Sequence, residues 1–178
     1  MSKINDRSGL SLQIRLVRPE DGAYFAALLG QDRETVRCMA SLPWPMTEST
    51  ATHWLKERLA DGACIYAVLR RDDRTFLGTA GYGLRSGREG TVAEVGFWVG
   101  RPYRGQGVAS RGLALALRRA AQDGAVLAVG NVFPDNAASA RVLRNNGFVF
   151  VGQHDEELPL RGGLRRLDVY QRSLGDDG

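Results

Sequence analysis

Residues 101–109, with the sequence Arg-Pro-Tyr-Arg-Gly-Gln-Gly-Val-Ala, have the composition of a loop that binds phosphate. They lie between an apolar segment predicted to be a strand and an amphipathic segment predicted to be a helix. Gly105 and Gly107 can adopt positive φ and let the backbone approach a ligand closely. The amides that follow would point into a concavity at the helix N-terminus, where the helix dipole favours an anion. The pattern predicts a phosphate or pyrophosphate site, and the alternative is a glycine-rich turn without a ligand.

Two well-known phosphate-binding loops do not fit this segment. A Walker loop ends in Gly-Lys-Ser or Gly-Lys-Thr, and the chain contains neither tripeptide. A Rossmann fingerprint needs a third glycine where Ser110 stands, and it follows an early strand rather than one that ends near residue 99. The segment is therefore a different kind of anion site.

Three polar residues nearby are candidates for chemistry. Glu94 interrupts an apolar strand and lies on the same face as Trp98 by period-two alternation. A carboxylate there is costly unless it is hydrogen-bonded or functional, and the alternative is a glutamate at the wet edge of the sheet paired with an arginine. Asn136 and Ser139 begin a predicted helix, where both could simply cap backbone amides.

The remaining elements must position these groups. Alternation and turn residues predict strands over residues 12–18, 63–70, 75–84, 91–99, 125–132, 148–154 and 165–172. Helices are predicted over residues 20–29, 33–39, 48–59, 108–122 and 136–146, with Thr47 and Gly147 as caps. Stiff or polar loops are predicted over residues 42–45, 85–90 and 153–166. The order predicts one α+β (mixed α/β) domain over residues 1–178, with a βαβ unit at the centre and flexible tails at 1–10 and 175–178.

Composition narrows the class of protein. The chain has 178 residues, a net charge of +4 and 43% hydrophobic residues, which is typical of a globular domain. The basic residues are dispersed, so we expect no nucleic-acid partner. No apolar run is long enough for a membrane span, and we expect no membrane partner. Cys38 and Cys64 form neither a disulfide framework nor a metal-binding pattern, so we expect no metal and a cytoplasmic location.

Several segments resemble one known family. Residues 104–109 resemble motif A of the GNAT superfamily of N-acetyltransferases. Residues 93–99, residues 136–143 with the following Gly147 and Phe148, and the loop over residues 42–45 resemble the RimJ/RimL-type branch, the ribosomal-protein N-terminal acetyltransferases and their relatives. The similar segments occur in the right order and span roughly residues 12–172. The resemblance implies a GNAT-like central mixed, mostly antiparallel sheet of about seven strands flanked by helices.

The resemblance implies acetyl-CoA as cosubstrate. In the family, the pyrophosphate rests on motif-A amides, and pantetheine lies between two splayed strands, bonded to backbone like an added strand. Carried onto this chain, the cosubstrate residues are Trp98, Val99, Arg104, Gly105, Gln106, Gly107, Val108, Ala109, Ser110 and Asn136. The motif works through amides, so the Arg104 side chain is expected to be solvated.

Catalytic roles follow the same resemblance, with two departures. Many members carry a tyrosine acid seven residues after the motif asparagine, where this chain has Leu143; the branch suggests Ser139 instead. Some relatives carry a glutamate five residues before that asparagine, where this chain has Asn131, which cannot act as a base. Glu94 is therefore the candidate general base.

We predict an N-acetyltransferase that transfers acetyl from acetyl-CoA to a primary amine by direct attack in a ternary complex. The predicted acceptor is a protein N-terminus or a small-molecule amine. We also expect a homodimer, because dimers are common in such families. The acceptor pocket is expected between residues 28–59 and 153–166, with candidate lining residues Trp44, His53, Trp54, Tyr82 and Arg85. The alternative function is a non-catalytic acyl-CoA-binding sensor module.

Overall fold

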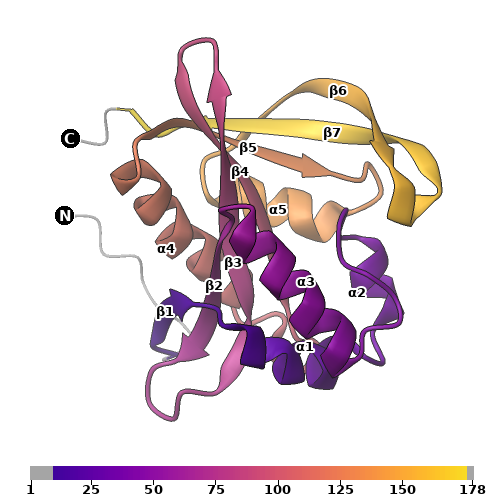
Figure 1. Ribbon diagram of the computed structural model, residues 1–178. Coiled ribbons are helices and arrows are strands. Elements are labelled where there is room, and N and C mark those ends of the chain that lie inside the picture. Colours follow the sequence, from indigo (N-terminus) through magenta and orange to yellow (C-terminus); the bar gives the residue numbers. More distant parts are fainter. Residues whose placement is uncertain (1–9, 176–178) are drawn as a thin grey trace.

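The computed structural model describes residues 10–175 as a seven-stranded sheet with helices on both faces (Figure 1). Apart from residues 10 and 175 themselves, the predicted tails lie outside the described residues. The strands are β1 Leu12–Leu16, β2 Cys64–Arg70, β3 Phe76–Gly87, β4 Gly90–Val99, β5 Ala125–Val132, β6 Val149–Leu158 and β7 Gly163–Ser173. The α-helices are α1 Gly22–Leu29, α2 Arg33–Arg37, α3 Glu48–Ala60, α4 Val108–Gln122 and α5 Ala137–Asn145. Short 3₁₀ helices are η1 Pro19–Asp21, η2 Arg101–Tyr103 and η3 Pro159–Arg161.

The sheet has the strand order β1-β2-β3-β4-β5-β7-β6. Only β4 and β5 pair in parallel, and α4 connects them, whereas the other neighbours are antiparallel. The predicted mixed sheet with a central βαβ unit is therefore confirmed.

The two faces of the sheet carry different helices (Figure 1). On one face, Phe25 of α1 and Leu55 of α3 pack against Trp98 and Phe76 of the sheet. On the other face, apolar residues of α4 and α5 pack beneath β5 and β7 in the group Leu113, Leu117, Ala128, Val132, Ala140, Leu143, Phe148 and Tyr170. Among residues 10–175, no helix combines the length and hydropathy needed to cross a membrane.

Two segments predicted as loops are hairpins. β3 and β4 stay paired out to Gly87 and Gly90, so most of the expected loop over residues 85–90 is strand around a two-residue turn. β6 and β7 stay paired out to Leu158 and Gly163, which replaces the expected loop over residues 153–166. Their charged residues had indicated loops, but at exposed strand positions such side chains simply face solvent or a cross-strand partner.

Leu143 of α5 offers a direct test of how β5 is supported. Its side chain is fully buried, and a Cβ added at Gly130 of β5 would lie 2.7 Å from its Cδ2 atom. Leu143→Ala should therefore leave a cavity and lower the free energy of unfolding by about 2–5 kcal/mol in urea titration. Leu16→Ala, at a site that is 52% exposed on the edge strand β1, should change it by less than about 0.5 kcal/mol. Equal stability of the two variants would contradict this packing.

Candidate active site

The central feature of the site is a gap where β4 and β5 part. Their registered pairs run from Thr91 with Ala125 to Glu94 with Val129, and beyond Glu94 the two strands no longer pair. Each strand stays paired on its other side, β4 with β3 and β5 with β7. The gap is therefore bordered by two strand edges whose backbone groups have no partner across it.

Backbone alternation shows which β4 residues face this gap. The Gly100 amide donates to the Leu77 carbonyl at 2.9 Å, and in this antiparallel register the backbone groups of Trp98 and Glu94 point to β3. Those of Val95, Phe97 and Val99 consequently point into the gap. Val99, which the sequence analysis named as a candidate cosubstrate contact, therefore has its backbone groups directed into the gap.

The backbone groups of Trp98, unlike those of Val99, point away from the gap. Its backbone groups serve the β3 ladder, and its side chain is 4% exposed and packs edge-on against Phe25, with ring centroids 4.9 Å apart. The Trp98 side chain therefore belongs to the core between the sheet and α1.

Gly105 and Gly107 open the N-terminus of α4. Both have φ of +73°, a conformation that side-chain-bearing residues rarely adopt. A Cβ at Gly105 would meet nothing within 4 Å, and one at Gly107 would meet only the Cδ atom of Arg111, at 3.8 Å. Gly107 is the N-cap of α4 and contributes no side chain, and the first helical amide bond runs from Arg111 to the Gly107 carbonyl. The amides of Val108, Ala109 and Ser110 are therefore left without an intrahelical partner, as an anion site requires.

Side-chain hydrogen bonds hold this loop and the first turn of α4. The Gln106 side-chain amide donates to the Pro102 carbonyl at 3.3 Å. The Ser110 hydroxyl accepts from Asn145 at 3.3 Å, and Asn146 donates to the Ser110 carbonyl at 3.0 Å. The start of α4 is thus tied to the end of α5.

The Arg104 side chain is 40% exposed, as expected for a solvated group, but it is also hydrogen-bonded. Its Nε donates to the Val99 carbonyl at 3.1 Å, and its Nη2 donates to the Thr35 hydroxyl at 2.6 Å and to the Asp32 carboxylate. Burial alone would raise the pKa of Asp32, but hydrogen bonds from Thr35 and Arg104 outweigh it and hold that pKa below its usual value. Arg104 therefore joins the loop to the N-terminus of α2.

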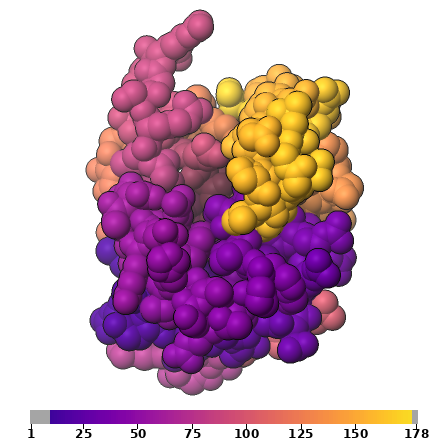
Figure 2. Space-filling model, turned by 45° about the vertical axis from the view of Figure 1, so that its right-hand side comes forward, coloured from indigo at the N-terminus to yellow at the C-terminus, as the bar shows by residue number. Residues whose placement is uncertain are grey.

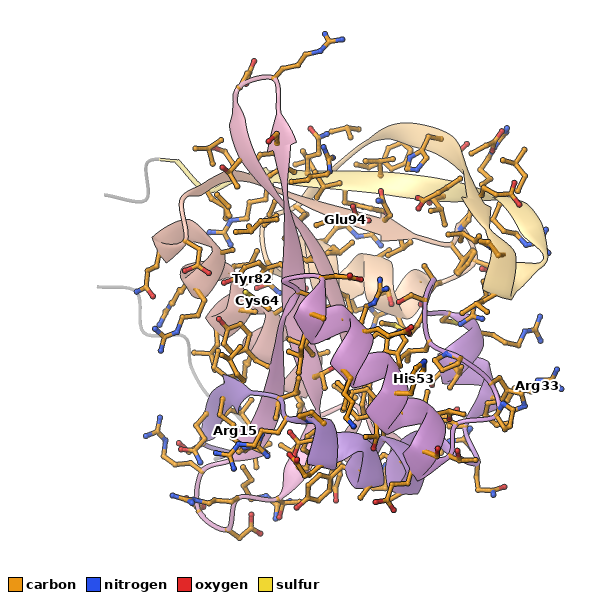
Figure 3. All side chains as sticks on the ribbon, viewed as in Figure 1. Arg15, Arg33, His53, Cys64, Tyr82 and Glu94 are labelled. Carbon is orange, nitrogen blue, oxygen red and sulfur yellow. The ribbon has the colours of Figure 1, made fainter. Side chains whose placement is uncertain are left out.

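Glu94 lies at the last registered pair before the strands part. Its Oε1 accepts from Asn131 Nδ2 at 3.1 Å, its Oε2 lies 3.9 Å from Arg85 Nε, and its side chain is 46% exposed. In Figure 3, Glu94 lies on the opposite side of the sheet from Tyr82. The carboxylate is thus hydrogen-bonded by Asn131 and lies near Arg85, as in the arginine pairing considered from the sequence. Nearly half of the side chain is nevertheless exposed.

Asn131 is a site residue whose role the sequence reasoning missed. It replaces a family glutamate, yet its amide spans from β5 to the Glu94 carboxylate on β4, and its Oδ1 atom is buried without a partner. The only indication in the sequence was its position on the predicted strand over residues 125–132.

Asn136 caps α5. Its Oδ1 accepts from the Ser139 amide at 3.1 Å, so the ordinary capping role is present. Its side-chain nitrogen takes no part in that cap. Ser139 is half-buried on the first turn, whereas Leu143 points into the core.

A pocket of about 560 Å³ lies beside α3, on the same face of the sheet as Glu94. Figure 2 shows this face hollowed between α3, the β3–β4 hairpin and the tip of the β6–β7 hairpin. The pocket is lined by Ser41, Pro43, Ser49, Thr50, His53, Trp54, Glu57, Arg58 and Leu160. Of the candidate lining residues, His53 and Trp54 lie here. Tyr82 instead donates to Asp123 at the end of α4, at 2.6 Å on the other face. The described residues contain no group of acidic, histidine and cysteine side chains placed to hold a metal.

Comparisons with known proteins agree with this fold. Residues 11–149 match the model of the acetyltransferase (GNAT) domain. Among solved structures, RimJ from Mycobacterium smegmatis in complex with CoA-disulfide is similar, with a TM-score of 0.78, 21% identity, and 91% of this chain and 81% of that one covered. The ribosomal-protein-S5-alanine acetyltransferase from Vibrio fischeri gives a TM-score of 0.74 at 19% identity, with 93% and 94% covered. The protein yncA from Salmonella typhimurium, with its cofactor acetyl-CoA, gives 0.67 at 20% identity, with 94% and 95% covered. A search of curated protein sequences gave no match.

Proposed function

Because this chain belongs to the GNAT acetyltransferase family, we propose that it is a single acetyltransferase domain that transfers acetyl from acetyl-CoA to a primary amine. The acceptor is a protein N-terminus or a small-molecule amine, and both substrates bind together before the amine attacks. The observation that carries the proposal is the gap between β4 and β5, which leads to the open N-terminus of α4. That combination offers a strand edge for an amide-bearing arm and free amides for its phosphates.

Acetyl-CoA would lie along this path. The pyrophosphate would accept from the amides between Gly105 and Ser110, and the pantetheine amides would pair with the β4 edge at Val99. The free side-chain nitrogen of Asn136 would donate to the pantetheine arm. Arg104 would act by holding the loop rather than by touching phosphate, because its guanidinium is already bound to Asp32 and Thr35.

The chemistry needs few groups. The amine nitrogen attacks the thioester carbonyl carbon, the new C–N bond forms and the C–S bond then breaks. Glu94 takes the proton from the amine, directly or through a water, and the hydrogen bond from Asn131 orients its carboxylate. Unpaired amides of the β4 edge polarise the carbonyl, and the Ser139 hydroxyl donates to the departing sulfur. Alignment of both substrates supplies much of the remaining acceleration.

The outer edge of the sheet supports a homodimer. β6 is an edge strand, and three consecutive apolar side chains on it, Val149, Phe150 and Val151, are 62%, 55% and 49% exposed. An apolar edge with unpaired backbone groups is a template for another strand, and a second copy of β6 pairing about a two-fold axis would cover it. We also place the protein in the cytoplasm, since its two cysteines are free thiols.

Cosubstrate binding tests the path at Gly107. Calorimetry with acetyl-CoA should give a Kd in the micromolar range for the wild type and no measurable binding for Gly107→Trp, whose side chain fills the space before the α4 amides. Gly124→Trp is the matched control, because Gly124 also has positive φ (+86°), has nothing within 4 Å of an added Cβ, and lies at the other end of α4. Equal loss in both variants, or no binding to the folded wild type, would contradict the proposed path.

Glu94→Gln tests catalysis against simple binding. The amide cannot take a proton, so kcat should fall by about 10²–10⁴-fold while the Kd for acetyl-CoA stays unchanged. The measurement is release of free thiol with a panel of peptide, polyamine and drug amines. Glu89→Gln, on the exposed turn of the β3–β4 hairpin, is the control and should keep full activity. Binding of acetyl-CoA without turnover of any amine would instead indicate a coenzyme sensor.

Light scattering after gel filtration tests the dimer. The wild type should have twice the monomer mass of 19.4 kDa. Charged lysines cannot be buried cheaply in an apolar pairing, so the double variant Val149→Lys, Val151→Lys should be monomeric. Leu16→Lys, 52% exposed on the opposite edge strand β1, should leave the dimer intact. A monomeric wild type would refute this assembly.

A further inference from the structure

Helix α2 is held at both of its ends by groups that belong to other parts of the molecule. It has only five residues, and its N-cap is Asp32, which is 4% exposed. Two arginines reach this carboxylate from the loop over residues 101–107, which together with the first amides of α4 is called the coenzyme cradle below. Arg101 Nη2 lies 3.2 Å from Oδ1, and Arg104 Nη2 donates to Oδ2. Thr35 adds its own amide and hydroxyl, at 3.3 and 2.9 Å. The N-terminus of α2 is therefore fastened to the loop that precedes α4.

A single arginine from the β6–β7 hairpin fastens the other end. Arg161, in η3 at the hairpin tip, donates to the carbonyls of Val36, Met39 and Leu42, with contacts of 2.7, 2.8 and 2.7 Å. These carbonyls belong to the end of α2 and the segment after it, and that of Val36 also accepts from the Met39 amide at 3.1 Å. Burial lowers the pKa of Arg161, and its hydrogen bonds go to backbone carbonyls. The hairpin tip is therefore fixed to the segment after α2.

These contacts form one continuous path through the site. At one end, Arg104 also donates to the Val99 carbonyl, at the β4 edge that borders the gap. At the other end, Leu160 sits beside Arg161 and lines the pocket together with Ser41 and Pro43, which belong to the segment that Arg161 holds. The path thus runs from the β4 edge through Arg104, Asp32, α2 and Arg161 to the pocket wall.

We propose that Asp32 and Arg161 are positioning residues, and that α2 couples the coenzyme cradle to the wall of the acceptor pocket. Asp32 acts through Arg104 on the shape of the loop that presents the α4 amides, and Arg161 holds the hairpin tip against the segment after α2. Binding of coenzyme at one end then stabilises these existing contacts, so that the hairpin tip at the other end opens less often. This inference rests on the proposed function, because it takes the cradle to bind coenzyme A.

Asp32→Asn separates this role from plain stability. Asparagine remains a good N-cap but has lost the charge that holds Arg101 and Arg104. Free coenzyme A is the probe, and calorimetry should show its Kd raised at least about fivefold, the lower end of coupling between linked sites. Asp21→Asn is the matched control: Asp21 is also 4% exposed and binds an arginine, Arg15, at 2.7 and 2.8 Å, but it lies before α1. Asp21→Asn should lower the melting temperature to a similar degree and leave the Kd unchanged.

Hydrogen exchange tests whether the coupling reaches the hairpin. Coenzyme A should slow amide exchange over residues 158–166 in the wild type, and this protection should disappear in Asp32→Asn and in Arg161→Met, measured at saturating coenzyme. Arg165→Met, at an exposed arginine of the same hairpin that donates to the carbonyl of its neighbour Leu164 at 3.3 Å, should retain the protection.

The outcomes distinguish the two proposals. A wild type that does not bind coenzyme A would refute the proposed function. A wild type that binds coenzyme A while Asp32→Asn binds it equally well, or while the hairpin protection survives in both variants, would overturn the coupling and leave the proposed function standing.

Discussion

The parting of β4 and β5 is the constraint on which the rest of the structure depends. Two parallel strands that separate leave a row of backbone groups without partners, which is costly unless a ligand or water satisfies them. The separation persists because each strand is fully engaged elsewhere: β4 is paired along its length with β3, and the far half of β5 is paired with β7. Helix α5 packs beneath β5 through Leu143, which fills the space left by Gly130. The protein is thus built so that its own sheet is complete on either side of the gap and incomplete within it.

The open start of α4 is aligned with this gap by polar contacts rather than by apolar packing alone. Asn146, which is 7% exposed, donates to the carbonyls of Ser110 and Val142, and its own carbonyl accepts from Arg172. Asn146 therefore joins the first turn of α4 and the last turn of α5 through its side-chain amide, and β7 through its backbone carbonyl. Removing its partners would cost more than the net value of each bond, since a buried unpaired amide bears its full desolvation penalty.

Much of the fold followed from local rules in the sequence. The bounds of α4 and β5 match their prediction because an amphipathic stripe, a glycine stop and a continuous apolar run each act over a few residues. The two long hairpins were missed because the charged residues 85–90 and 153–166 resemble loops, and only pairing with a partner strand shows otherwise. In the site, alternation predicted that Glu94 and Trp98 share a face, but it could not say that Trp98 directs its backbone to β3. That direction depends on the hydrogen-bond register between neighbouring strands, which single-strand patterns do not contain. The Glu94–Asn131 and Arg104–Asp32 contacts join residues 37 and 72 positions apart, and no spacing rule connects them.

The buried carboxylate of Asp32 also explains how a phosphate site can work without free arginines. An isolated negative charge this close to the start of α4 would oppose an anion, but Arg101 and Arg104 both lie on Asp32, so the three side chains together carry one positive charge. The arginines are held by the protein rather than by the ligand, and the amides and helix dipole of α4 are left to make the direct contacts. Binding of an anion by a fixed loop costs less entropy than binding by flexible arginines, because a side chain already ordered in the free protein loses little entropy when ligand binds. The net charge of only +4 is consistent with such a site, in which the proposed anion would be recognised by one loop rather than by the overall charge of the molecule.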